Sequence, residues 1–233
     1  LSSDVAELIL NRPLVDVGCP VSGELSRRET FEKLGLRFNK SQKYGNVYIS
    51  PRPTSEDLRA FYFESRARAF WLNEVWNETR DQRISKVIVP QLEWIRDGLA
   101  EHCSQKMFSI AEFGANHLGY ALSASAIFPE SCYSLVEPLI PKTMLHEGFA
   151  GEISVDQLTP ASQDAVLLFE TLDRAYDPKK TIYEAKAALK DGGLCFLTCL
   201  LSTGFEAQVL GEESDIFIPP ERMNIFSYEG LLA

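Results

Sequence analysis

The sequence predicts an α/β protein with a doubly wound, mostly parallel sheet, preceded by a small N-terminal segment of β and helical structure. From about residue 107 onward, short apolar runs alternate with stretches of helical periodicity, which is typical of a parallel sheet covered by helices on both faces. The first apolar run ends in an acid and a glycine, and a second glycine opens the next helical stretch, over Glu112–Gly119. At such a turn a doubly wound sheet binds a nucleotide-like ligand.

The elements of the expected sheet follow from local patterns. Apolar runs predict the strands, and the periodic stretches between them predict the helices. Gly192 and Gly193 are expected to form the turn that leads into the last strand. We expect strands at 107–113, 132–137, 152–155, 164–169 and 194–200, and helices at 118–127, near 141–147 and at 178–190.

Two further segments precede the sheet. Residues 1–54 combine a short amphipathic helix with short β-like pieces. Residues 55–104 have mainly helical periodicity after a Thr54 or Ser55 cap, and are expected to form a lid or linker. The sheet domain then takes up residues 105–233.

The composition excludes several classes of protein. Of the 233 residues 45% are hydrophobic and 24% charged, as is ordinary for a globular protein, and the formal net charge is −10. Because neutralising nucleic-acid phosphates requires a surplus of Lys and Arg, we expect no nucleic-acid partner. We also expect no membrane partner, since no apolar run approaches the about 18 residues of a span. The five cysteines form no CxxC pair, which suits a reducing, cytoplasmic compartment.

The loop after the first strand has the spacing of G-x-G-x-x-G, from Gly114 to Gly119, with Asn116 in place of the middle glycine. Gly114 lets the backbone approach a ligand without a Cβ atom between them. In dinucleotide enzymes the middle glycine admits the pyrophosphate. A ligand without pyrophosphate therefore fits this loop better than NAD does.

A second acid follows the next strand. Glu137 comes about 20 residues after the glycine loop, where a carboxylate accepts hydrogen bonds from ribose hydroxyls. The alternative is a surface glutamate at a strand end. Gly114 and Glu137 together favour an adenosine-type ligand at the top of the sheet.

Several short motifs occur in one order along the chain. They are Glu112-Phe113-Gly114 with Gly119, Glu137, Asp164-Ala165-Val166 through Glu170, Leu172-Asp173-Arg174 with Asp177-Pro178, and Leu189 through Gly193. This order resembles that of class I S-adenosylmethionine (SAM)-dependent methyltransferases, with a Rossmann-like sheet. The similarity is greatest to those with a leading zinc-ribbon-like segment, including sugar C-methyltransferases, and extends from Cys19-Pro20-Val21 to Phe226-Ser227.

The resemblance implies roles for individual residues. Glu112, Gly114, Asn116 and Gly119 would bind the methionine part of SAM, and Glu137 its ribose. Asp156 and Gln157 would flank the adenine, although Asp156 also fits a loop cap. Glu170 and the residues up to Arg174 would line the methyl-transfer pocket.

The zinc ligands of these relatives are largely replaced in this chain. Their cysteine pairs would fall at positions 19/22 and 41/44, where this sequence has Cys19, Ser22, Ser41 and Tyr44. Because a structural zinc ion needs four nitrogen or sulfur ligands, we expect no metal.

Two histidines of these relatives are replaced by Arg174 and Arg222. Arginine stays protonated and cannot act as a general base, so Glu221, Asp173 and Tyr62 become the candidate bases. The two arginines suit an anionic substrate, such as a phosphate or a carboxylate. Their alternative roles are intramolecular ion pairs or a solvated surface.

We therefore expect a SAM-dependent methyltransferase that acts on a small molecule, such as a nucleotide-linked sugar or a natural-product precursor. The loss of the family's histidines leaves a catalytically impaired binding or assembly module as an alternative, and an NAD-linked oxidoreductase as a weaker one. The final strands of the family's sheet are expected either to lie beyond Ala233 or to be absent from a shortened fold. The oligomeric state stays open.

Overall fold

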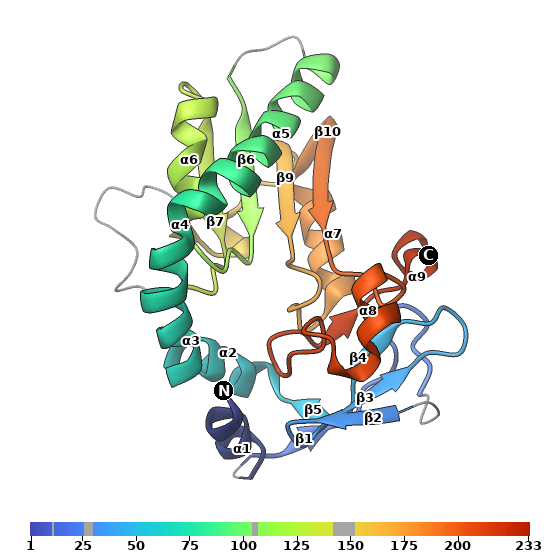
Figure 1. Ribbon diagram of the computed structural model, residues 1–233. Helices are drawn as coiled ribbons and strands as arrows, with labels where there is room; N and C mark the ends of the chain where they lie inside the picture. The colour runs from blue at the N-terminus through green and yellow to red at the C-terminus, as the bar shows by residue number, and fades with distance from the viewer. Residues whose placement is uncertain (11, 26–29, 104–106, 142–151) are drawn as a thin grey trace. The chain divides into compact units, whose positions relative to one another are not determined.

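The computed structural model describes residues 1–10, 12–25, 30–103, 107–141 and 152–233 (Figure 1). The chain divides into two compact units. Unit 1 comprises Leu1–Ala67, Glu170–Thr181 and Thr198–Ala233, and unit 2 comprises Arg68–Phe169 and Ile182–Leu197. The C-terminal residues from Thr198 onward thus belong with the N-terminal segment, whereas the ranges predicted from the sequence put them with the sheet.

Unit 2 contains a parallel sheet of the predicted kind. Its strand order is β10-β9-β6-β7-β8, and β9, β6, β7 and β8 run parallel. Along the chain these are the fifth, fourth, first, second and third strands, an order compatible with a Rossmann-like fold. The strands are β6 (Ser109–Phe113), β7 (Cys132–Val136), β8 (Glu152–Ile153), β9 (Gln163–Phe169) and β10 (Leu189–Thr198).

The five predicted strands are therefore confirmed in position, with two differences. β8 has only two residues, and β10 begins at Leu189 rather than at residue 194. Gly192 and Gly193 consequently lie inside β10, and the prediction of a turn before it was wrong. Gly192 has a φ of +79°, a backbone conformation that favours glycine. The helix predicted near 141–147 falls on 142–151, outside the described part of the chain.

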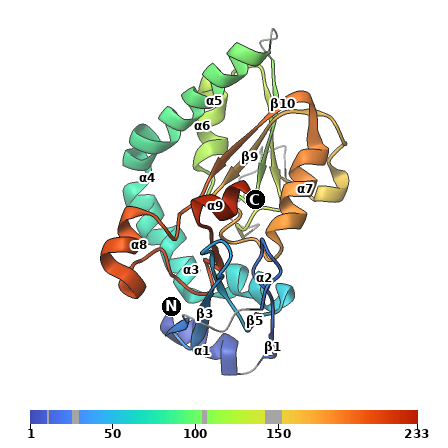
Figure 2. The ribbon, with the colours of Figure 1, turned by 90° about the vertical axis from the view of Figure 1, so that its right-hand side faces the viewer.

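Helices cover both faces of the unit 2 sheet. In Figure 2, α5 and α6 lie on one face and α7 on the other. Leu92, Ile95 and Leu99 of α5 recur at helical spacing, are buried, and pack in one core with Ile110 of β6. The helices of unit 2 are η1 (Trp71–Trp76), α4 (Asn77–Arg83), η2 (Ile84–Ile88), α5 (Val89–His102), α6 (Gly119–Ile127), η4 (Val155–Gln157) and α7 (Pro178–Ala188). Of these, η1 and η2 are π-helical. Two helices, α3 (Arg66–Phe70) and α7, run across a boundary between the units.

Unit 1 is built on an antiparallel sheet of order β11-β4-β3-β2, with β1 and β5 forming a separate pair. The predicted cap of α2 is confirmed, because the Thr54 hydroxyl accepts a hydrogen bond from Asp57 N at 3.2 Å. The elements are α1 (Ser2–Leu10), β1 (Leu14–Val15), β2 (Thr30–Lys33), β3 (Leu36–Lys40), β4 (Val47–Ile49), β5 (Arg52–Pro53), α2 (Ser55–Glu64), α8 (Phe205–Leu210), η5 (Gly211–Glu213), β11 (Asn224–Ile225) and α9 (Tyr228–Leu232).

Two similar turns occur in unit 1 where the resemblance places cysteine pairs. Gly23 N donates to Cys19 O at 2.8 Å, and Gly45 N donates to Ser41 O at 2.9 Å. The buried amide of Asn46 donates to Cys19 Sγ at 3.6 Å. Among the described residues, His, Cys, Asp and Glu side chains nowhere gather in a group of three or more that could hold a metal ion.

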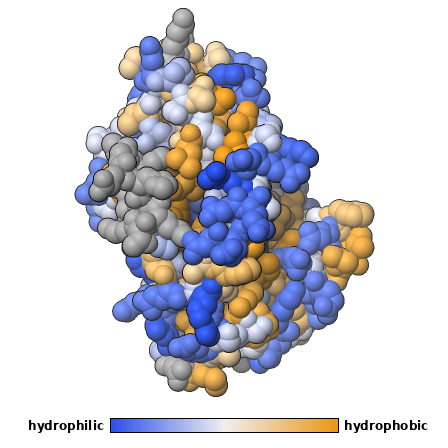
Figure 3. Space-filling model, turned by 60° about the vertical axis from the view of Figure 1, so that its left-hand side comes forward, coloured by the Kyte–Doolittle hydropathy of each residue, from blue (hydrophilic) through white to orange (hydrophobic). Residues whose placement is uncertain are grey.

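The described helices include none with the length and apolar character needed to cross a bilayer. Hydrophilic and hydrophobic residues are interspersed over the face shown in Figure 3, in keeping with the ordinary hydrophobic content of the chain.

Gly119, which was predicted to bind a cofactor, begins α6 at a close contact with η1 and η2. A Cβ atom there would lie 2.7 Å from Trp76 Cη2 and still closer to Ile88 Cδ1. We expect Gly119→Ala to lower the free energy of unfolding by about 1–3 kcal/mol because it overpacks this contact. Urea denaturation measures the change. Ser125→Ala, at an exposed position of the same helix, is the control, and equal stability of the two variants would contradict the packing role.

Candidate functional site

The sequence-predicted residues fall into two groups, one in each unit. The strand-end group lies in unit 2 and consists of Glu112, Gly114, Asn116, Gly119, Glu137, Asp156 and Gln157. The arginine network lies in unit 1 and consists of Tyr62, Glu170, Asp173, Arg174, Glu221 and Arg222.

Gly114 and Glu137 lie side by side at the carboxyl edge of neighbouring strands. Phe113 pairs with Val136 in the parallel register of β6 and β7, and Gly114 N donates to Val136 O at 2.8 Å. The φ angles of Gly114 and Glu137 are +61° and +48°. For a glutamate this conformation costs on the order of 1–2 kcal/mol, and such strain is common at functional sites. The sequence prediction that these two residues come together is borne out by this register.

The exposed Glu137 carboxylate lies next to η4, which carries the residues predicted to flank an adenine. Glu137 Oε1 accepts a hydrogen bond from Val155 N at 3.4 Å. Asp156 is exposed beside it. The Gln157 side-chain oxygen instead accepts from Ser154 N at 2.9 Å and caps the short helix. Both residues predicted near an adenine are thus exposed, but the Gln157 side chain is engaged in capping.

Arg68 is a residue that the sequence analysis missed. Its side chain is 3% exposed, and its guanidinium donates to the carbonyl oxygens of Asn116 and Leu139, the latter at 3.4 Å. It also lies over the ring of Trp71, at 5.2 Å from the centroid. Arg68 therefore links the loops that follow β6 and β7. Its position four residues before the buried Leu72, on the apolar stripe of the helical segment, is a sequence signal that could have identified it.

His117 is held between aromatic rings in the loop after β6. Its ring stacks on Trp76 at 4.1 Å and on Tyr120 at 5.6 Å, and its Nδ1 accepts from Gly119 N at 3.1 Å. Because Nδ1 accepts this hydrogen bond, it carries no proton in this arrangement. His117 thus fixes the loop against η1 and caps the start of α6.

Glu112 lies inside unit 2 rather than at its surface. Its side chain is 3% exposed, and Tyr133 Oη donates to Glu112 Oε2 at 2.6 Å. Burial raises the pKa of Glu112 to about 7, although the hydrogen bond from Tyr133 acts in the opposite direction. Glu112 is therefore a buried carboxyl that changes charge near neutral pH.

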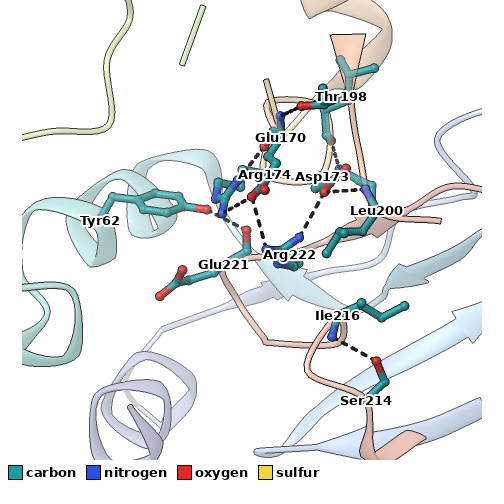
Figure 4. A network of polar contacts seen from close by, with 12 residues as sticks. Tyr62, Glu170, Asp173, Arg174, Thr198, Leu200, Ser214, Ile216, Glu221 and Arg222 are labelled. Carbon is teal, nitrogen blue, oxygen red and sulfur yellow. Dashed lines mark hydrogen bonds and ion pairs between the residues drawn. The ribbon is translucent and has the colours of Figure 1, made fainter. Parts of the chain in front are cut away.

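The arginine network joins two guanidinium groups to one carboxylate (Figure 4). Arg174 Nη2 and Arg222 Nη2 each lie 3.2 Å from Glu170 Oε2, and Arg222 Nη1 lies 3.3 Å from Asp173 Oδ2. Glu170 directly follows β9 and has a φ of +51°. Its N–H donates to Thr198 O at 2.8 Å. Both arginines thus make intramolecular ion pairs, which was one of the three roles considered from the sequence.

Two of the three candidate bases are engaged within unit 1. Asp173 is 0% exposed, and burial raises its pKa to about 6 in spite of the nearby Arg222 and Arg174. Tyr62 Oη donates to the backbone oxygen of Glu221 at 3.0 Å. The Glu221 carboxylate, which is half-buried, points away from the ion pairs in Figure 4.

Comparison with known proteins adds no assignment. The chain matches none of the protein-family models and none of the curated proteins.

The buried Glu112 predicts a pH-dependent stability. Its pKa is 4.5 in the unfolded chain and about 7 in the fold, so its contribution to stability is complete below pH 4.5 and is lost as the pH rises through 7. Relative to Glu112→Gln, the wild-type protein should lose up to about 3 kcal/mol of unfolding free energy across this window. Urea denaturation from pH 5 to pH 8 measures the difference between the two proteins.

Tyr133→Phe provides the control for this pH dependence. It removes the hydrogen bond that lowers the pKa of Glu112, so the loss of stability should move to higher pH. Parallel profiles of the wild-type protein and Glu112→Gln would show that Glu112 keeps one protonation state throughout.

Proposed function

We propose that this chain is a SAM-dependent methyltransferase that acts on a small-molecule acceptor, with SAM bound at the strand-end group of unit 2. The observation that carries the proposal is the juxtaposition of Gly114 and Glu137 at the carboxyl edge of β6 and β7. β6 lies between β7 and β9, where the strand order of the sheet reverses. Doubly wound sheets bind adenosine-type ligands outside this edge.

The residues at this edge fit the parts of SAM. The glycine at position 114 leaves the backbone accessible without a Cβ atom, as the methionine part requires. The exposed Glu137 carboxylate accepts hydrogen bonds from ribose hydroxyls, and the exposed Asp156 lies next to it for the adenine. Arg68 and His117 hold the loop between these contacts in place. When bound, SAM would supply a methyl group from its sulfonium sulfur, and the rest of the cofactor would leave as a neutral thioether.

The loop favours SAM over a dinucleotide. Asn116 takes the place of the glycine that admits a pyrophosphate, and its carbonyl oxygen is held by Arg68. A loop fixed by a buried arginine has little freedom to open for a larger phosphate group. An NAD-linked activity is therefore the weaker reading of the same edge.

A non-catalytic binding module is the second candidate function, and one observation favours it. Asp173 is buried and paired with Arg222, and the hydroxyl of Tyr62 donates to a carbonyl oxygen. Two of the three candidate bases are thus engaged within the protein. Saturable SAM binding without S-adenosylhomocysteine formation across a panel of small-molecule acceptors, unchanged by Glu221→Gln, would favour this second function.

Isothermal titration with SAM and with S-adenosylhomocysteine tests the binding site. Glu137→Gln should weaken both affinities about tenfold or more, because it removes a charged acceptor of ribose hydrogen bonds. Glu130→Gln, which makes the same change at an exposed position before β7, is the matched control and should leave both affinities unaltered. Absence of heat with either ligand, or saturable binding of NAD(H) in their place, would contradict the proposal.

A further inference from the structure

The arginine network places two cations with little solvent exposure around one partly exposed anion. The side chains of Arg174 and Arg222 are 7% and 15% exposed, whereas that of Glu170 is 42% exposed. Although burial opposes it, the nearby Glu170 raises the pKa of Arg174, so this guanidinium stays charged. Two fixed cations therefore face a position that solvent reaches, and Glu170 occupies that position.

The hydrogen-bonding capacity of Arg174 is not used up. Its Nε atom is buried and makes no hydrogen bond to any residue that the structure describes. Its Nη1 donates to Glu170 O at 2.7 Å and its Nη2 contacts the Glu170 carboxylate. A buried guanidinium with an unused donor fits a binding role better than a purely structural one, because leaving a buried donor without a partner is unfavourable.

Glu170 is suited to leave this position. Its side chain is partly exposed, and ion pairs that solvent can reach are weak. Its backbone is fixed separately, by the hydrogen bonds of its N–H to Thr198 O and Oγ1. The side chain can therefore turn out to solvent without disturbing the chain around it.

We infer that Arg174 and Arg222 form a binding site for the carboxylate of a small molecule, and that the Glu170 side chain fills this site when the ligand is absent. The bound carboxylate forms ion pairs with both guanidinium groups, as Glu170 Oε2 does in the structure. Glu170 is then an internal competitor that sets the affinity. The inference does not depend on SAM binding and is tested without SAM.

The charges around the site favour a carboxylate over a phosphate ester. Arg174 and Arg222 supply two positive charges, and the groups that face Arg174 include Asp173, Glu221 and the phenol of Tyr62. With Glu170 turned away, the two acids already balance the two arginines at neutral pH. A singly charged carboxylate adds less repulsion here than a phosphate dianion, and it matches the planar fork of a guanidinium.

Propionate is the matched probe, because its carbon and oxygen atoms are those of the glutamate side chain beyond Cα. Glycine accepts the left-handed backbone at position 170, so Glu170→Gly removes the competing side chain without straining the chain. In this variant, propionate should raise the melting temperature more than chloride does at equal ionic strength. The wild-type protein should show the same saturable response with an apparent affinity about tenfold weaker, because Glu170 competes. Propionamide, which has the same shape without the charge, should have no effect.

Three variants make the outcome decisive. Adding Arg222→Gln to Glu170→Gly should abolish the propionate response, whereas Glu213→Ala, an exposed acid of unit 1, should behave as the wild-type protein does. Glu170→Gln, which keeps the size of the side chain, should also respond to propionate more strongly than the wild type, and it serves if the glycine variant does not fold. Equal effects of propionate and propionamide, a stronger response to methyl phosphate, or no saturable response in the wild-type protein would each overturn the inference.

Discussion

The parallel register of β6 and β7 is the constraint on which the candidate cofactor site depends. Because Phe113 pairs with Val136, Gly114 and Glu137 leave the sheet at the same level and turn with the same left-handed backbone. A slip of one residue would exchange the faces of every side chain in the strand. The hydrogen bond from Tyr133 to Glu112 joins the same two strands inside unit 2, so a one-residue slip would break this contact as well as the alignment of Gly114 with Glu137.

Glu112 and Asp173 are buried carboxyl groups that the protein stabilises in different ways. Glu112 accepts a hydrogen bond from a tyrosine hydroxyl. Burial raises its pKa, so protonation removes the cost of a buried negative charge. Asp173 lies beside Arg222 and Arg174, which hold its pKa below the value that burial alone would give. An unpaired buried charge costs several kcal/mol, so each carboxyl needs one of these two solutions. Only the second leaves fixed charges available to a ligand.

Features set by local pattern were predicted from the sequence, and features set by distant contacts were not. The positions of the strands, the Thr54 cap and the pairing of Gly114 with Glu137 follow from hydrophobic runs and turn residues. The contact of Gly119 with Trp76 and the grouping of residues after Thr198 with the N-terminal segment depend on long-range packing. Arg68 was missed for the same reason, because its two carbonyl partners lie 48 and 71 residues away along the chain.

The network in unit 1 contains arginines and no histidine among its six residues, and this sets the chemistry available to it. A histidine there could exchange a proton near neutral pH, whereas Arg174 and Arg222 keep theirs at any pH a folded protein tolerates. In the structure their charges are paired with the carboxylates of Glu170 and Asp173. Of these two acids only Glu170 is partly exposed, and only it can be exchanged for an anion from solvent. A network with two fixed cations and one replaceable anion suits recognition of a ligand better than catalysis of proton transfer.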